Sequence, residues 1–232
     1  MRDQYSLGAY AGLIFTKLDL PPVPPVDVDK VLEWMNASSR QVITETVASY
    51  KQRFPEKQYP WRPVRAHDGK AWDIEFKTQF PELVEYVNLF PPHVIGRVLL
   101  LAQLPDEDVY AHTDPDLGIG WRVYLTSGGP KLYFNKFKGW HKDNADAQIR
   151  IGFPEIPSRI KPERFYAPLP DTPHPWALTS ICAAHSVEKN TASATARLCI
   201  LILPKYGSVD AAAHHDLLRR STEKYAEDAI WY

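Results

Sequence analysis

Hydrophobic and polar positions alternate along the second half of the chain in a way that predicts short β-strands. From 121 to 126 the period is two: one face takes Trp121, Val123 and Leu125, and the other takes Arg122, Tyr124 and Thr126. Further strands are predicted over 94–104, 108–114, 131–137, 176–187 and 194–203. Short strands between turns, without alternating long helices, predict an antiparallel barrel or sandwich.

The N-terminal part of the chain has a different pattern. The proline-rich run 21–25 predicts an extended linker. Asp27 stands where it can cap a helix whose apolar side includes Trp34. A second helix is predicted over 39–51.

Helices are also predicted around the strand-rich region. Residues 54–80 are expected to be irregular or to form short strands. Pro81 suits the first turn of a short helix that ends before Pro91. The charged, alanine-rich tail over 208–229 is predicted to be helical. The expected fold class is therefore mainly β with flanking α.

Composition narrows the class of protein. A chain of 232 residues with 44% hydrophobic residues suits one domain with a real core. A formal net charge of −1 gives no reason to expect nucleic acid or a membrane as a partner. Cys182 and Cys199 both lie in apolar runs, so a disulfide-stapled secreted fold is not expected. With no signal-peptide pattern and no apolar run near ~18 residues, the expected location is the cytoplasm.

One segment pairs an imidazole with a carboxylate at strand spacing. In the run Tyr110-Ala111-His112-Thr113-Asp114, His112 and Asp114 are two positions apart, so a strand would direct both side chains to one face. Such a pair supplies two members of the 2-His-1-carboxylate set that binds Fe(II) and leaves positions open. A histidine beside a turn aspartate is also common on ordinary surface loops.

His185 is the candidate third ligand. It stands in a stretch, 181–187, that is apolar except for His185 and Ser186, and it is flanked at strand spacing by Ala183 and Val187. A lone histidine in an apolar strand is often a satisfied core residue. Here the small alanines leave space beside the ring, so a ligand role is also open.

Arg197 lies in the apolar segment 194–203, twelve positions after His185. A buried guanidinium is costly unless an anion or another partner meets it. It could pair with a buried carboxylate of the protein or bind the carboxylate of a ligand. A hairpin between the two segments would bring His185 and Arg197 side by side.

These residues together resemble a known signature. His112-Thr113-Asp114, the strand ending at His185, and Arg197 before an apolar run are similar to the H-x-D…H…R pattern of Fe(II)/2-oxoglutarate oxygenases. Within that superfamily the pattern resembles the aspartyl/asparaginyl β-hydroxylase-like branch, which includes the cis-proline hydroxylases. The resemblance covers roughly 94–204. It implies a double-stranded β-helix, a jelly-roll or cupin-like core with supporting N-terminal helices.

The resemblance also implies roles for individual residues. His112, Asp114 and His185 would hold Fe(II), and Arg197 would bind the distal carboxylate of the cosubstrate 2-oxoglutarate. Arg122, ten positions after His112, matches a second cosubstrate arginine of this branch, and Tyr124 on the same face is a candidate hydrogen-bond donor. The implied reaction uses O₂ to hydroxylate an amino acid, a peptidyl residue or a related small molecule, releasing succinate and CO₂. Asp114 favours hydroxylation over halogenation, because related halogenases lack the carboxylate.

The implied layout is a single catalytic domain over 1–232. Supporting helices and the linker take 1–92, the β-helix core 93–204, and the helical tail 205–232. The 73 positions between the two histidines exceed the usual gap of the branch, and the excess falls in a polar insert over 138–175. This insert is either a lid over the site or a solvated surface excursion.

Two other functions remain open from the sequence. One is a cupin-like metal protein without 2-oxoglutarate, which would not need a buried arginine at position 197. The other is a non-catalytic jelly-roll module that binds a sugar or peptide. Four other histidines are not expected to be metal ligands: His67 at a turn, His93 near a strand start, and His214 and His215 in the charged tail.

Overall fold

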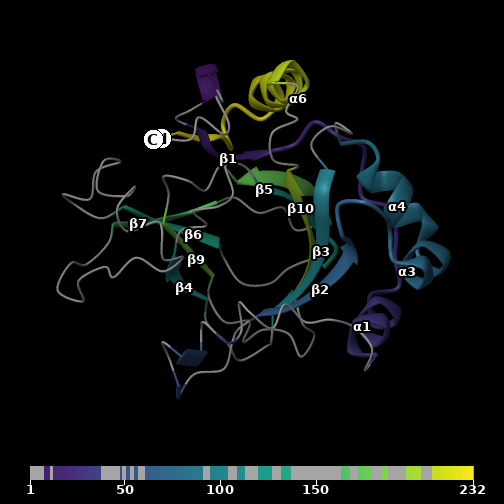
Figure 1. Cartoon of the computed structure of the whole chain (residues 1–232). Coiled ribbons are helices and arrows are strands. Elements are labelled where there is room, and N and C mark those ends of the chain that lie inside the picture. The colour runs from purple at the N-terminus through teal and green to yellow at the C-terminus, as the bar shows by residue number, and fades with distance from the viewer. Residues whose placement is uncertain are drawn as a thin grey trace.

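The strands form two antiparallel sheets that face each other (Figure 1). The computed structural model of the chain describes residues 8–10, 13–37, 48, 51–52, 55–56, 61–90, 95–103, 109–112, 120–126, 132–136, 163–167, 172–178, 184–187, 197–204 and 211–231. Within these ranges one sheet has seven strands and the other has four. The fold is thus mainly antiparallel β with few helices, which is compatible with a jelly-roll or cupin fold.

The larger sheet has the strand order β11-β1-β8-β5-β10-β3-β2. Its longest strands, β3 and β10, pair with each other along their whole length, and β2 lies beyond β3 at the edge of the sheet. In chain order the strands are β1 (Leu13–Lys17), β2 (Trp61–His67), β3 (Ile95–Gln103), β5 (Gly120–Tyr124), β8 (Pro175–Leu178), β10 (Arg197–Pro204) and β11 (Ile230–Trp231).

The smaller sheet has the order β4-β9-β6-β7. Its strands are β4 (Val109–His112), β6 (Leu132–Lys136), β7 (Glu163–Tyr166) and β9 (Ala184–Val187). β7 lies within the segment 138–175 that the sequence suggested as an insert, and it pairs with β6. The strands predicted over 94–104, 108–114, 121–126, 131–137 and 194–203 are confirmed as β3, β4, β5, β6 and β10.

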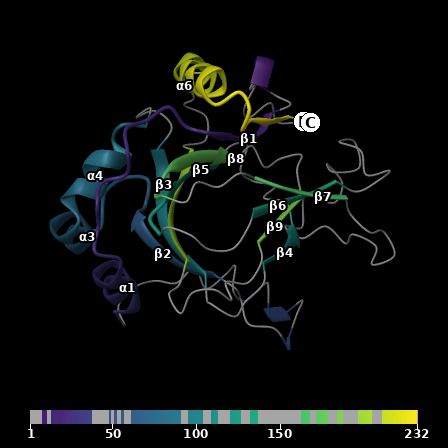
Figure 2. The same ribbon diagram turned by 180° about the vertical axis from the view of Figure 1, so that it is seen from behind.

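Helices cover the side of the larger sheet that faces away from the smaller one. Figure 2, seen from behind, shows the same arrangement of α1, α3 and α4 beside β2 and β3. The helical elements are η1 (Gly8–Tyr10), α1 (Val28–Asn36), α3 (Ile74–Gln79), α4 (Pro81–Val87) and α6 (Ala211–Lys224). The second helix predicted over 39–51 lies almost wholly outside the described residues.

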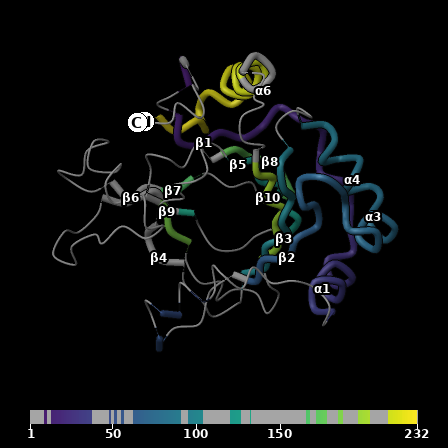
Figure 3. Tube along the Cα trace, viewed as in Figure 1, coloured from purple at the N-terminus to yellow at the C-terminus, as the bar shows by residue number. Residues whose placement is uncertain are grey.

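Local chemistry explains where these helices begin. The Asp27 side chain accepts a hydrogen bond from the Lys30 amide, which confirms the predicted cap of α1. The extended run 21–25, which connects β1 to α1, passes alongside α4 and α3 (Figure 3). Tyr86 of α4 holds this run by donating from Oη to the Pro21 carbonyl at 2.7 Å.

The helix α3 was not predicted, because 54–80 was expected to be irregular or short-stranded. It has only six residues, too few for a clear helical period. The Asp73 side chain accepts from the Phe76 amide at 2.8 Å and caps it, and Phe76 packs on the rings of Trp34 and Trp72. Tertiary contacts, rather than helix propensity, therefore stabilise this turn and a half.

Two hydrophobic cores lie on the two faces of the larger sheet. The helix-facing core joins alternate residues of β3, β5 and β10 to α1, α3, α4 and α6. The core between the sheets joins Tyr124, Trp176 and Cys199 of the larger sheet to Leu132 and Val187 of the smaller one. The predicted alternation of 121–126 is confirmed, since Trp121, Val123 and Leu125 face the helices and Tyr124 faces the other sheet.

Two details of the sequence prediction are wrong. The segment 176–187 was expected to be one strand, but it supplies β8 to the larger sheet and β9 to the smaller sheet. The segments that contain His185 and Arg197 were expected to form a hairpin. Instead β9 pairs with β4 and β6, whereas β10 pairs with β3 and β5. The chain changes sheets here, which hydrophobic periodicity alone does not reveal.

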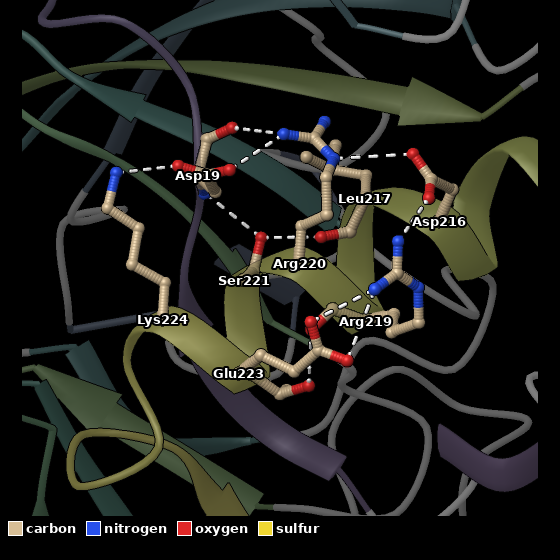
Figure 4. A network of polar contacts seen from close by, with 9 residues as sticks. Asp19, Asp216, Leu217, Arg219, Arg220, Ser221, Glu223 and Lys224 are labelled. Carbon is tan, nitrogen blue, oxygen red and sulfur yellow. Dashed lines mark hydrogen bonds and ion pairs between the residues drawn. The ribbon is translucent and has the colours of Figure 1, made fainter.

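The C-terminal helix α6 holds the N-terminal strand in place, as Figure 4 shows. Asp19, just after β1, binds Arg220 Nη1 at 2.7 Å and Lys224 Nζ at 2.6 Å. The buried Ser221 hydroxyl accepts from the Asp19 amide at 3.0 Å. Beyond the helix, Asp228 binds Lys17 at 2.6 Å. These contacts attach the C-terminal segment to the end of β1. The predicted tail helix is confirmed. No helix in the described part of the chain is long and apolar enough to cross a membrane.

Candidate functional site

The face of the larger sheet that is turned toward the smaller one carries three of the residues predicted from the sequence. Tyr124 and Cys199 lie opposite each other across β5 and β10 and belong to the core between the sheets. Because residues two apart on a strand share a face, Arg122 and Arg197 lie on this same inner face. Both arginines are buried, with 8% and 2% of their surface exposed.

Arg197 lies at the start of β10, opposite Gln103 of β3. Its Nη1 donates to Gln103 Oε1 at 3.4 Å, which is long for a hydrogen bond. Its guanidinium carbon lies 5.1 Å from the centre of the Tyr124 ring, within the range of a cation–π contact. The sequence did not identify Gln103, which lies 94 positions away along the chain.

Tyr124 is 1% exposed, and its environment favours the neutral phenol. Burial raises the pKa of Tyr124 above its ordinary value, while the Arg197 charge and hydrogen bonds with Thr126 and Arg197 act in the opposite direction. The phenol therefore keeps its proton at neutral pH. A protonated Tyr124 can donate a hydrogen bond to an anion bound beside Arg197.

Two neighbours determine where the Arg122 side chain lies: the ring of Trp176 and the glycine at position 120. It lies opposite Trp176 of β8, and its guanidinium carbon is 5.1 Å from the Trp176 ring centre. Gly120 lies two residues before Arg122, on the same face. A Cβ at position 120 would lie 2.8 Å from Arg122 Nη1, closer than real Cβ contacts allow. Glycine at position 120 thus leaves the space that the guanidinium occupies.

Cys199 links the surroundings of the two arginines. Burial raises the pKa of the Cys199 thiol, and the charges of Arg197 and then Arg122 act in the opposite direction. Both guanidinium groups therefore act on one buried point of the inner face. Cys199 is a free, buried cysteine, as expected for a small core residue. The inner face is consequently a region of concentrated positive charge, which favours an anionic ligand.

His185 lies on the smaller sheet and faces the same space. Val187, two residues later on β9, belongs to the core between the sheets. Strand alternation places His185 on that inner side as well. The imidazole is 4% exposed and therefore almost fully buried. His185 and Arg197 thus lie on opposing sheets rather than on neighbouring strands.

The register of the smaller sheet places His112 directly opposite His185. The preceding pair is Val109 with Val187, so β4 has one more residue than β9 between the two pairs. Without this β-bulge, Ala111 would stand opposite His185. Directly opposed positions share one face of a sheet and lie close together. The bulge therefore makes the two histidines a cross-strand pair, and bulges of this kind are common beside functional sites.

The third predicted ligand, Asp114, lies outside the described residues, as does the side chain of His112. Within the described residues no group of three or more His, Cys, Asp or Glu forms a metal site. Two histidines at opposed backbone positions, with an aspartate two residues beyond one of them in the sequence, nevertheless have the donor chemistry that Fe(II) takes in facial-triad sites. The donor set of this chain therefore fits such an ion.

Three residues of the inner face were missed by sequence reasoning, namely Gln103, Gly120 and Trp176. Each acts on a predicted arginine from another strand or from a position two residues away. Only the strand period relating Gly120 to Arg122 was visible in the sequence. His67, expected at a turn, accepts from the Gly69 amide on Nδ1 at 3.0 Å, which confirms that expectation.

Comparison with known proteins gives structural neighbours only. No protein-family model and no curated protein matches the chain. Among solved structures, the chain is similar to an oxidoreductase of the 2OG-Fe(II) oxygenase family from Burkholderia pseudomallei, with 14% identity over 88% of this chain and 92% of that one and a TM-score of 0.40. AviO1 from Streptomyces viridochromogenes Tue57 has 14% identity over 90% and 98%, with a TM-score of 0.40. Oxalate decarboxylase from Bacillus subtilis has 11% identity over 76% and 39%, with a TM-score of 0.30.

Proposed function

We propose that this chain is an Fe(II)- and 2-oxoglutarate-dependent hydroxylase of the aspartyl/asparaginyl β-hydroxylase-like branch, with a double-stranded β-helix core. The observation that supports this most strongly is the pairing of His112 with His185 on one sheet, while two buried arginines occupy the inner face of the opposite sheet. A metal site needs the first feature, and a dicarboxylate cosubstrate needs the second. The two buried guanidinium groups are costly for a purely structural core.

His112, Asp114 and His185 are the residues that would hold the ion. Bound by these three residues, the iron would supply the oxidising chemistry. The intact carboxylate at Asp114 favours hydroxylation. His185 is itself almost fully buried, so bulk water has little access to its imidazole.

Arg197 and Arg122 would bind and orient the cosubstrate. A guanidinium offers a planar pair of donors that matches a carboxylate. The ring of Tyr124 supports Arg197 and that of Trp176 supports Arg122, so both cations are positioned before any ligand arrives. Tyr124, kept protonated by burial, would donate to the ligand beside Arg197. The implied products are succinate, CO₂ and a hydroxylated small molecule or peptide.

Succinate release is the test of this proposal. Purified protein is incubated with Fe(II), 2-oxoglutarate and a panel of amino acids and peptides, and succinate is measured. We expect release that needs both Fe(II) and 2-oxoglutarate and that the Arg197→Ala variant loses at low cosubstrate concentration. An Arg219→Ala variant, changed on the exposed side of α6, is the matched control. Metal-dependent turnover that needs no 2-oxoglutarate would support a cupin-like enzyme instead. If the unmodified protein binds no Fe(II), both the oxygenase and the cupin-like enzyme are contradicted.

A further inference from the structure

A single row of residues crosses the inner face of the larger sheet and carries a cation at three places. The strand registers place the members side by side on β1, β8, β5, β10, β3 and β2. In this order they are Lys17, Trp176, Arg122, Leu201, Leu99 and Arg65. The cations therefore stand at one end, near the middle and at the other end of the row.

The three cations differ in what surrounds them. Lys17 binds Asp228 at 2.6 Å, and Arg122 stacks on Trp176. The Arg65 side chain is half-buried and makes no hydrogen bond or ion pair with the residues that the structure describes, and its Nε is buried without a partner among them. Buried polar groups normally have partners, so this guanidinium has the capacity to bind something further.

Arg65 faces the space between the sheets. It lies opposite Leu99, while its neighbour Val64 lies opposite Leu100 in the helix-facing core. Arg62, three residues earlier, lies opposite Ala102 on the helix side and donates to Asn36. The two arginines of β2 therefore point to opposite faces of the sheet, and Arg65 is the one on the inner face.

Leu99 and Leu201 lie between Arg65 and Arg122, and Leu203, opposite Arg97, extends the same apolar cluster to one side of the row. Each of these leucines keeps 6% of its surface exposed, whereas their strand neighbours on the helix side, Leu100, Ile200 and Ile202, are 0% exposed. The three leucines form a cluster of their own, and Leu101 packs against both this cluster and the core between the sheets. The inner face is thus less completely covered here than the helix-facing side.

The spacing gives this surface a size. β5, β10, β3 and β2 are consecutive in the sheet, so the backbone of Arg122 and that of Arg65 are separated by three strand spacings, or about 14 Å. The two leucines of the row lie between them. A molecule with an apolar body of several carbons and one anionic end fits such a surface, with its body on the leucines and its anion at Arg65.

We propose that Arg65 and the leucines 99, 201 and 203 form the binding surface for the acceptor substrate, and that this substrate is an anion with an apolar body, such as a carboxylate. That the bound molecule is a substrate rests on the proposed function, whereas the binding of such an anion at Arg65 does not depend on it. Arg122 and Arg197 are left for the cosubstrate. Arg65 then selects for the negative charge, and the leucines select for apolar length.

The probe for this surface is octanoate, with octanamide as its uncharged counterpart. Binding to the full chain is measured by isothermal titration calorimetry without iron or 2-oxoglutarate. We expect Arg65→Gln to weaken octanoate binding about tenfold or more, because a charge-assisted contact is lost. Octanamide should bind more weakly than octanoate and be indifferent to Arg65→Gln. Affinity should rise about fourfold for each methylene added from butanoate to octanoate, since each one buries apolar surface.

The matched control is Arg62→Gln, which changes the same residue type on the same strand but on the helix side. It should leave octanoate affinity unchanged. Equal octanoate affinity in the unmodified chain and in Arg65→Gln would overturn the proposal, as would no octanoate binding at all. Succinate release is a separate measurement. Loss of octanoate binding in Arg65→Gln together with no succinate release from any substrate would refute the oxygenase function while supporting the Arg65 site.

Discussion

The two faces of the larger sheet differ although they are made by the same strands. Along β10, Leu198, Ile200 and Ile202 turn toward the helices, and all three are 0% exposed. The residues that alternate with them turn toward the smaller sheet, beginning with Arg197 and Cys199. One face is a sealed apolar core, and the other contains buried cations, a phenol and a thiol.

This contrast separates stability from chemistry at the level of single residues. Burial of the helix-facing side chains stabilises the fold in proportion to the apolar area removed from water. The inner face gives up part of that stabilisation, because buried guanidinium groups need costly compensation. Buried charged groups are concentrated at ligand-binding and catalytic sites. Substitutions on the two faces should therefore have different signatures.

The largest effect is expected on the helix-facing side. Ile200→Ala removes a fully buried side chain that lies between Leu100 and Val123 on the neighbouring strands. We expect the free energy of unfolding to fall by about 2–5 kcal/mol, as for other large-to-small core substitutions. Urea denaturation measures this loss. The affinity of the folded protein for 2-oxoglutarate should not change, and a change of tenfold would contradict the separation of the two faces.

The next effect is expected at Arg197. Arg197→Ala should weaken 2-oxoglutarate binding roughly tenfold to a hundredfold, because a hydrogen bond to a charged group contributes about 1.5–3 kcal/mol. The KM for 2-oxoglutarate should rise, while Fe(II) binding stays intact. Cosubstrate titrations and thermal melts of this variant are the measurements. A strongly destabilised variant with unchanged cosubstrate affinity would instead assign Arg197 to a structural ion pair.

A smaller effect is expected at Gly120. In Gly120→Ala the new Cβ would lie 2.8 Å from Arg122 Nη1, so the guanidinium must move away from its place beside Trp176. We expect a severalfold loss of 2-oxoglutarate affinity with little loss of stability. The control is a double-mutant cycle with Arg122→Gln. If Gly120→Ala weakens binding equally in the Arg122→Gln background, the glycine does not act through Arg122.

The smallest effect on stability is expected at Asp19 and its ion pairs with α6, shown in Figure 4. The hydrogen bond from Lys224 lowers the pKa of Asp19, helped by Arg220 and opposed by partial burial. A lowered pKa means that the stabilisation is present above the ordinary value of 3.8 and is lost as pH falls through the lowered value. Asp19→Asn should cost under about 1 kcal/mol at neutral pH and flatten the acid limb of the stability profile. An unchanged acid limb would contradict this.

The sequence was informative wherever a local period or a cap determined the structure. Alternation over 121–126 correctly assigned Arg122 and Tyr124 to the face opposite Trp121. The Asp27 cap and the N-terminal Pro81 correctly marked the starts of α1 and α4. These signals depend on residues within a few positions of one another, so they survive without knowledge of the tertiary fold.

The pairing of strands that are far apart in the chain could not be predicted from the sequence. The hairpin expected between His185 and Arg197 does not form, because β9 and β10 belong to different sheets. The bulge that brings His112 opposite His185 is set by the register of two strands more than seventy positions apart. The contacts of Trp176 with Arg122 and of Gln103 with Arg197 are also made between strands far apart in sequence. Such features follow from topology, which local patterns do not encode.

Fe(II) binding tests most directly the claim that the space between the sheets is a metal-dependent active site. His185 and Ser186 are adjacent on β9, both are almost fully buried, and they face opposite sides of the smaller sheet. Anaerobic equilibrium dialysis should find one Fe(II) per chain in the unmodified protein and in Ser186→Ala, and none in His185→Ala. Full iron content in His185→Ala, or equal loss in both variants, would contradict the assignment of His185 as a ligand.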